Sequence, residues 1–262
     1  MRRKLYIGTN TKMFQTGCEA EEYIKRMDCL IDDIRDRLEF FFIPSFTSLD
    51  RVVRAVGDRI RIGAQNMAWE ERGQFTGEVS PLMLDELGVR FVLIGHSERR
   101  HVFGETDEQE AKKIRCAADH GFTALRCVGE TLEQKESGKS LEAVREQLLT
   151  DTAGLTAEEA SRLLWIGYEP VWAIGTSGVP ASASYAEDMH GFIKDVLAQT
   201  FGEQGRYIPV LYGGSVNPAN APEMAEREGI DGLFIGRSAW EPERFNSIIR
   251  EVLPIFERRS DR

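Results

Sequence analysis

The chain has 262 residues, 42% of them hydrophobic, and is therefore long enough to bury a large core. Its 43 acidic and 33 basic residues give a net charge of -10, which argues against a broad binding surface for nucleic acid or for an anionic membrane. An anionic substrate therefore needs a local positive site. The four cysteines show no CxxC spacing, and the basic start is followed by an apolar run too short for a signal peptide or a membrane span, which predicts a cytoplasmic protein.

Short apolar runs recur along the chain and predict strands, and amphipathic segments between them have the three- and four-residue apolar spacing of helices. The predicted strands cover residues 5–9, 40–43, 60–64, 91–94, 122–127, 164–168, 208–211 and 233–235. The predicted helices cover residues 19–37, 108–120, 141–150, 185–200 and 243–253.

Continuously apolar strands indicate a parallel sheet that is buried on both faces. Eight strand-helix units in about 250 residues match a closed (β/α)8 barrel. An open doubly wound sheet is the competing fold, but it usually carries a glycine-rich dinucleotide turn after its first strand, and residues 8–12 lack this pattern. Because no linker rich in Pro, Ser or Gly divides the chain, we predict one α/β domain over residues 1–262.

Polar side chains follow the predicted strands at the points where they end. In a (β/α)8 barrel these points all face one mouth, where such enzymes carry their sites. The first strand is followed by Asn10 and Lys12, the third by Gln65 and Asn66, the fourth by residues 95–100, and the sixth by Glu169.

Glu169 lies between a buried strand and a segment that is suited to close over it. Pro170 favours extended geometry in the residue before it, and a stiff apolar section is followed by glycines at 175 and 178. A carboxylate, a rigid flap and a soft hinge are the parts of a gated general base. Ile174 on the flap and Phe234 on the eighth strand are expected to press an apolar clamp against the carboxylate.

His96 opens a predicted helical turn, whose positive end favours a neutral imidazole. Such an imidazole can donate a proton to a developing enediolate and take it back. Ser97 beside it does not predict a hydrolase, since the chain has no GxSxG elbow. No His pair has ligand spacing and the carboxylates do not cluster as cation cages do, so we predict neither a metal nor a cofactor.

Two glycine turns predict a phosphate site. Gly213, Gly214 and Ser215 follow the seventh strand, and residues 236–238 follow the eighth. Such turns expose backbone N–H groups that bind phosphate oxygens, and barrels of this kind place a phosphate site after strands seven and eight.

Six motifs, in order and almost from end to end, resemble triosephosphate isomerases: residues 10–13, 63–66, 75–80, 95–100, 168–176 and 212–216. In that family a Glu base, a neutral His and a closing loop carry out the reaction. The resemblance implies a TIM barrel and a cofactor-free isomerase acting on a small phosphorylated sugar. It implies that Glu169 is the base, His96 the electrophile, Lys12 the positive charge, Asn10 an orienting residue and Glu98 the partner of Lys12.

The same resemblance implies that Gly175, Ser215 and Gly236 hold the phosphate, with Gly214 shaping the turn. It also implies that the loop carrying Thr76 reaches into a second subunit near Asn10, which predicts a homodimer without nucleic-acid or membrane partners.

The chain departs from the family in three places. The family's Gly-Gly-Ala-Ser-Leu after the last strand is here residues 236–240, Gly-Arg-Ser-Ala-Trp, so Arg237 replaces a phosphate-loop glycine and can face solvent or the phosphate. Thr11 and Phe14 replace a Trp and an Asn of the first loop, and residues 177–181 replace the usual flap hinge.

Residues 178–182, 211–218 and 231–240 are similar to a sister branch, the L-erythrulose-1-phosphate isomerases of tetritol catabolism. This branch implies interconversion of L-erythrulose 1-phosphate and D-erythrulose 4-phosphate. One added carbon typically changes discrimination by about 1–3 kcal/mol, so a few side chains can set the choice. Two alternatives remain open: a triosephosphate isomerase that interconverts dihydroxyacetone phosphate and D-glyceraldehyde 3-phosphate, and a non-catalytic phosphate-binding barrel.

Overall fold

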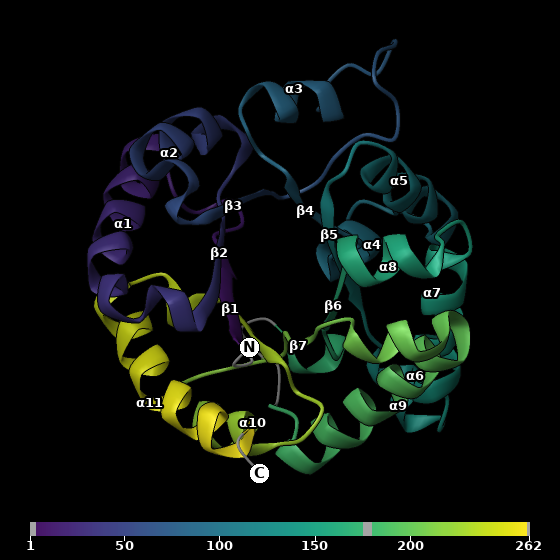
Figure 1. The fold of residues 1–262 in the computed structure, drawn as a ribbon. Helices are drawn as coiled ribbons and strands as arrows, with labels where there is room; N and C mark the ends of the chain where they lie inside the picture. The colour runs from purple at the N-terminus through teal and green to yellow at the C-terminus, as the bar shows by residue number, and fades with distance from the viewer. Residues whose placement is uncertain (1–3, 175–179, 261–262) are drawn as a thin grey trace.

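Eight parallel strands form a closed barrel in the computed structural model, which describes residues 4–174 and 180–260. Each strand pairs with the next along the chain, and Ile7 of the first strand pairs with Leu233 of the last, which closes the ring. The predicted (β/α)8 barrel is therefore confirmed, and the open doubly wound sheet is excluded (Figure 1). The strands are β1 Leu5–Asn10, β2 Leu38–Ile43, β3 Arg61–Ala64, β4 Phe91–Ile94, β5 Thr123–Val128, β6 Leu164–Tyr168, β7 Val210–Tyr212 and β8 Gly232–Ile235.

Helices surround the barrel, and several begin at a Thr whose hydroxyl caps the first turn. They are α1 Gly17–Leu30, α2 Leu49–Val56, α3 Pro81–Glu86, α4 Ser97–His101, α5 Asp107–Asp119, α6 Leu132–Glu136, α7 Ser140–Thr152, α8 Ala157–Leu163, α9 Ala183–Phe201, α10 Ala221–Glu226 and α11 Pro242–Ser260. The 3-10 segments are η1 Asp32–Arg37, η2 Phe46–Ser48, η3 Gly57–Arg59, η4 Val171–Ala173, η5 Gly202–Tyr207 and η6 Arg237–Ala239.

Two predicted helices have different ends in the structure. The segment predicted as one helix over residues 19–37 divides into α1 and η1, where Arg35 binds the carbonyl of Asp28 and the carboxylate of Asp32. The last helix does not end before Pro254 as predicted but continues to Ser260. Beyond the proline, Phe256 is buried and Arg259 donates to the carbonyls of Ala225 and Ile230. These contacts offset the one helical hydrogen bond that a proline removes.

Alternate residues of each strand face two different cores. Phe41, Leu125 and Phe234 belong to the cluster inside the barrel. Ala124 and Val128 belong to the larger cluster between the barrel and the helices. Because all eight strands run parallel in the closed barrel, their carboxyl ends surround one mouth, where polar residues that follow them meet.

Candidate active site

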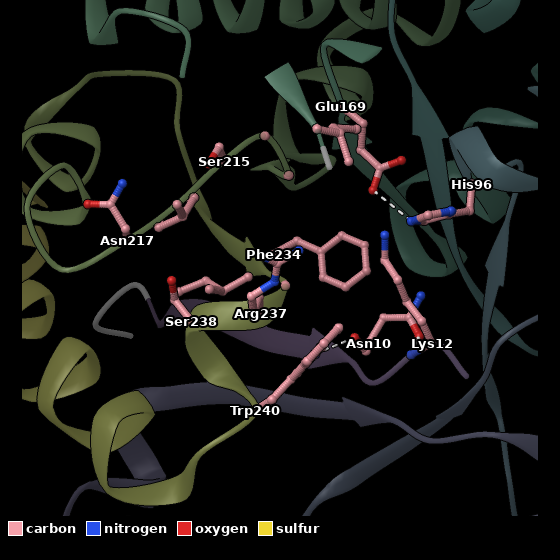
Figure 2. A pocket seen from close by; sticks show the side chains of 16 residues that line it. Asn10, Lys12, His96, Glu169, Ser215, Asn217, Phe234, Arg237, Ser238 and Trp240 are labelled. Atoms are coloured by element: carbon pink, nitrogen blue, oxygen red, sulfur yellow. Dashed lines mark hydrogen bonds and ion pairs between the residues drawn. The ribbon is translucent and has the colours of Figure 1, made fainter. Parts of the chain in front are cut away.

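One cavity of about 310 Å³ opens at the mouth of the barrel and collects the polar residues that follow the strands (Figure 2). Of the predicted site residues that the structure describes, all but Glu98 line this cavity, and Glu98 binds Lys12 beside it. Gly175 lies outside the described residues. The cavity is lined by Asn10, Lys12, His96, Glu169, Ile174, Gly213, Gly214, Ser215, Val216, Asn217, Phe234, Ile235, Gly236, Arg237, Ser238 and Trp240.

Glu169 and His96 face each other across one end of the cavity. The Oε1 atom of Glu169 lies 3.5 Å from Nε2 of His96, and both side chains are buried. The other carboxylate oxygen lies 3.4 Å from the backbone N–H of Ser97, at the start of α4. The main chain of Glu169 is held here because its backbone N–H donates to the carbonyl of Val128, which extends the pairing of β6 with β5 by one residue.

The surroundings of His96 favour its neutral Nε2–H form. His96 is the N-cap of α4, and its Nδ1 accepts the backbone N–H of Glu98 at 3.2 Å. An Nδ1 that accepts a hydrogen bond cannot carry a proton, so the proton lies on Nε2 and points towards Glu169 and the cavity. The imidazole can therefore donate to an oxygen held between the two side chains.

Lys12 is fixed both at its main chain and at its ammonium group. Among the non-glycine residues that the structure describes, Lys12 alone has a positive backbone φ, 52°. Its N–H donates to Oδ1 of Asn10, and Gln65 donates both to that oxygen (3.0 Å) and to the carbonyl of Lys12 (2.8 Å). Its ammonium lies 2.6 Å from Glu98, with about a fifth of the lysine side chain exposed. These contacts stabilise an otherwise unfavourable backbone conformation.

The two glycine turns line the cavity from beside Glu169 to Ser238. A Cβ on Gly213 would lie 2.9 Å from Cγ of Glu169, and one on Gly214 would lie 2.3 Å from the hydroxyl oxygen of Tyr212. Glycine is therefore required for the close approach of this turn to the base. At Arg237 the backbone φ is negative, which explains why a side chain is accepted where the family has glycine.

A buried carboxylate that the sequence reasoning missed, Glu130, holds the start of the flap. It accepts hydrogen bonds from the hydroxyls of Tyr168 (3.0 Å) and Tyr185 (2.8 Å) and from the indole of Trp172 (2.7 Å). Glu130 follows β5 almost directly, so the strand-end pattern that found Glu169 also applied to it. Its bond to Trp172 ties the apolar section between Glu169 and Ile174 to β6 and α9, which carry the other two donors.

A second group of carboxylates lies away from this cavity. Among the residues in the described ranges, Asp107, Glu110 and Asp151 have oxygens close enough together for a cation. Two guanidinium groups occupy that position instead: Arg126 pairs with Glu110 (2.7 Å) and with Asp151, and Arg100 pairs with Glu110 (2.5 Å). The charge that a metal ion would supply is already present.

A closed (β/α)8 barrel with a polar cavity at the carboxyl ends of its strands is the architecture of TIM-barrel enzymes. The sequence profile of the family described as triosephosphate isomerase matches residues 5–252. The chain belongs to this family, whose members are isomerases, and the predicted family resemblance is confirmed.

The relatives with high similarity to the chain include several L-erythrulose-1-phosphate isomerases. That of Rhizobium etli is 42% identical over 259 residues, with 98% of this chain and 96% of the relative covered. That of Mesorhizobium japonicum is 44% identical, with 95% and 97% covered, and that of Brucella abortus is 40% identical, with 94% and 95% covered. The predicted similarity to this branch is confirmed.

Proposed function

We propose that the protein interconverts L-erythrulose 1-phosphate and D-erythrulose 4-phosphate. The observation that carries the proposal is the placement of Glu169 and His96, 3.5 Å apart, in one cavity with the two glycine turns. A base and a proton donor at one end and a phosphate-type site at the other match a small sugar phosphate. The names of the relatives support the four-carbon substrate.

The proposed reaction moves protons between adjacent carbons. Glu169 removes the proton from C3 of L-erythrulose 1-phosphate, and the C3–H electron pair forms a C2–C3 double bond while His96 protonates the C2 oxygen. The C3 hydroxyl of this enediol then loses its proton to His96, and Glu169 returns its proton to C2. The product carries its carbonyl at C3, which is D-erythrulose 4-phosphate when it is numbered from the other end. Electrons balance within the sugar, so the step needs no redox cofactor.

The positive groups of the site act on the intermediate. Lys12 lies beside Asn10 and stabilises the negative charge that develops on the enediolate oxygens. The buried position of Glu169 and His96 strengthens these interactions, since little water competes with them. Ile174 and Phe234 line the same cavity and supply the apolar contact around the base.

Comparison of kcat/KM for two substrates on one preparation tests the proposal. We expect the value for L-erythrulose 1-phosphate to exceed that for D-glyceraldehyde 3-phosphate. A much larger value for the triose phosphate would instead establish triosephosphate isomerase activity. That activity is the second candidate because of the family match. Glu169→Asp withdraws the carboxylate without changing its charge. An unchanged rate in this variant would show that another group is the base.

Arg237 is proposed to bind the phosphate together with Gly214, Ser215 and Gly236. Its side chain lines the cavity and has no ion-pair partner in the part of the chain that the structure describes. Replacement by Gly restores the family residue at a position with negative φ, and replacement by Lys retains the charge. We expect inorganic phosphate to inhibit Arg237→Gly about tenfold more weakly than the parent protein. Inhibition of Arg237→Lys should lie between that of the parent and that of Arg237→Gly. Unaltered inhibition in both variants would place the guanidinium in solvent.

A homodimer is proposed from the apolar surface beside the mouth. Met13, Phe75, Val102 and Phe103 are exposed by 94, 43, 71 and 67% of their surface. The segment between β3 and α3, which carries Thr76, projects away from the barrel (Figure 1). Such exposed apolar groups mark interaction surfaces. Light scattering on a size-exclusion column is expected to give twice the 29.6 kDa chain mass, and a monomer would contradict the proposal.

We also propose that the protein works in the cytoplasm. All four cysteines are free, which supports a reducing compartment. Among the helices of the described residues, none is both long and apolar enough to cross a membrane.

A further inference from the structure

We propose that Trp240 is a positioning residue that fixes the main chain at Asn10 and thereby the place of Lys12. The inference rests on the isomerase function proposed above. The indole N–H of Trp240 donates to the backbone carbonyl of Asn10 at 3.0 Å, and the ring lines the cavity below Asn10 (Figure 2). This bond joins the turn after β8 to the turn after β1.

The bond acts where the main chain changes direction. The carbonyl of Asn10 lies two residues before Lys12, whose positive φ needs support from its surroundings. Gln65 and the side chain of Asn10 support Lys12 from the β3 side. Trp240 supports the same turn from the other flank of β1, where it follows the neighbouring strand β8.

An aromatic contact fixes the indole itself. The ring of Phe14 lies 4.5 Å from that of Trp240, between their centroids. Phe14 and Trp240 stand where the family pattern has Asn and Leu. Thr11, between Asn10 and Lys12, stands where the pattern has Trp. The indole of Trp240 brings to this junction an N–H donor that the side chain of leucine lacks.

A matched pair of variants separates positioning from packing. Trp240→Phe retains a ring but removes the N–H. Tyr23→Phe is the control, because the hydroxyl of Tyr23 donates to the carbonyl of Ala239, the residue before Trp240, from the core side. Each variant therefore removes one hydrogen bond to a backbone carbonyl at the same junction, but only Trp240→Phe releases Asn10.

The measurements are kcat and KM for L-erythrulose 1-phosphate, inhibition by inorganic phosphate, and hydrogen exchange at the amide of Lys12. We expect Trp240→Phe to lower kcat about tenfold, as for a misplaced catalytic group, with phosphate inhibition changed by less than about twofold. The Lys12 amide should exchange faster. Tyr23→Phe should leave kcat and this exchange unchanged.

The outcomes distinguish this inference from the proposed function. A parent protein that isomerises neither substrate contradicts the function, while hydrogen exchange at Lys12 still tests the positioning. Unchanged exchange in Trp240→Phe, or an equal loss of kcat in Tyr23→Phe, would overturn the role of Trp240.

Discussion

The mouth of the barrel and the buried group around Arg126 both bring opposite charges together, but they do so in different surroundings. At the mouth, Lys12 and Glu98 form an ion pair with 20 and 46% of their side chains exposed. Behind the barrel wall, the side chains of Arg126, Glu110 and Asp151 are wholly buried. Arg126 lies on β5, while the two carboxylates come from α5 and α7.

The difference shows that similar residue types serve different ends. Buried charges depend on one another, because removal of one partner leaves the others without compensation in a region of low dielectric. Solvent-exposed partners are screened and can change contacts when a ligand binds. Changes at the mouth should therefore alter activity, and changes in the buried group should alter stability.

The two regions touch at Gly95. A Cβ on this residue would lie 1.6 Å from a guanidinium nitrogen of Arg126, and its φ is 70°. Glycine is thus required there, directly before His96. The buried group in this way supports the backbone that carries the proposed electrophile.

The largest expected effect is that of Glu169→Gln on activity. Loss of the base should lower kcat by about 10²- to 10⁴-fold. The melting temperature should change little, since the contacts of the carboxylate with the Ser97 N–H and with His96 are long, at 3.4 and 3.5 Å. Glu110→Gln is the control, another buried carboxylate changed to an amide, and it should retain most of the activity. Equal losses of activity in the two variants would erase the distinction between the regions.

Arg126→Met should have the largest effect on stability. It leaves Glu110 and Asp151 buried near each other, which typically costs about 3–5 kcal/mol of unfolding free energy. Urea denaturation measures this loss. Adding Glu110→Gln and Asp151→Asn should recover part of it, because the uncompensated charges are then removed. Stability that is unchanged in Arg126→Met would contradict the mutual dependence of these charges.

The pH dependence of stability should also report on the buried group. Burial raises the pKa of Glu110 from 4.5 to about 7 and that of Asp151 from 3.8 to about 6, against the opposing effect of the two arginines. The folded protein then binds these protons more tightly than the unfolded chain does. The resulting stabilisation is full below about pH 4 and is lost as the pH rises towards about 7, by an amount on the order of 6 kcal/mol for the two groups together.

Denaturation of Glu110→Gln at a series of pH values tests this direction. The variant should show a flatter decline between pH 4.5 and about 7. Carboxylates with a lowered pKa, such as Glu159 at about 2, act in the opposite direction and in a more acidic range. A parent protein whose stability rises across the window from 4.5 to about 7 would contradict the raised pKa of Glu110.

Strand ends were predictable from the sequence because each apolar run stops where a polar residue begins. This pattern identified Asn10, Lys12, His96 and Glu169, and the structure brings them to one cavity. It could not identify the buried group. Arg126 lies inside an apolar run and faces outwards by the two-residue period of a strand, and its partners belong to separate helices.

Short helices and contacts between turns that are distant in the chain could not be predicted from the sequence either. Helices such as α3 and α10, of six residues each, have too few turns for a clear apolar period. Trp240 marked a branch of the family in the sequence, but its bond to Asn10 depends on the closure of β8 onto β1. Long-range contacts of this kind follow from the assembled barrel.

The smallest expected effect is that of Glu98→Gln at the mouth. It removes the charge from an ion pair of 2.6 Å that is partly exposed, so the unfolding free energy should change by no more than about 0.5 kcal/mol. The value of kcat/KM should fall about two- to fivefold, because Lys12 loses the partner that orients it. Lys25→Gln breaks a pair of the same length on α1, far from the mouth, and should change neither quantity measurably. A stability loss in Glu98→Gln as large as that in Arg126→Met would mean that the mouth, too, depends on its charges for folding.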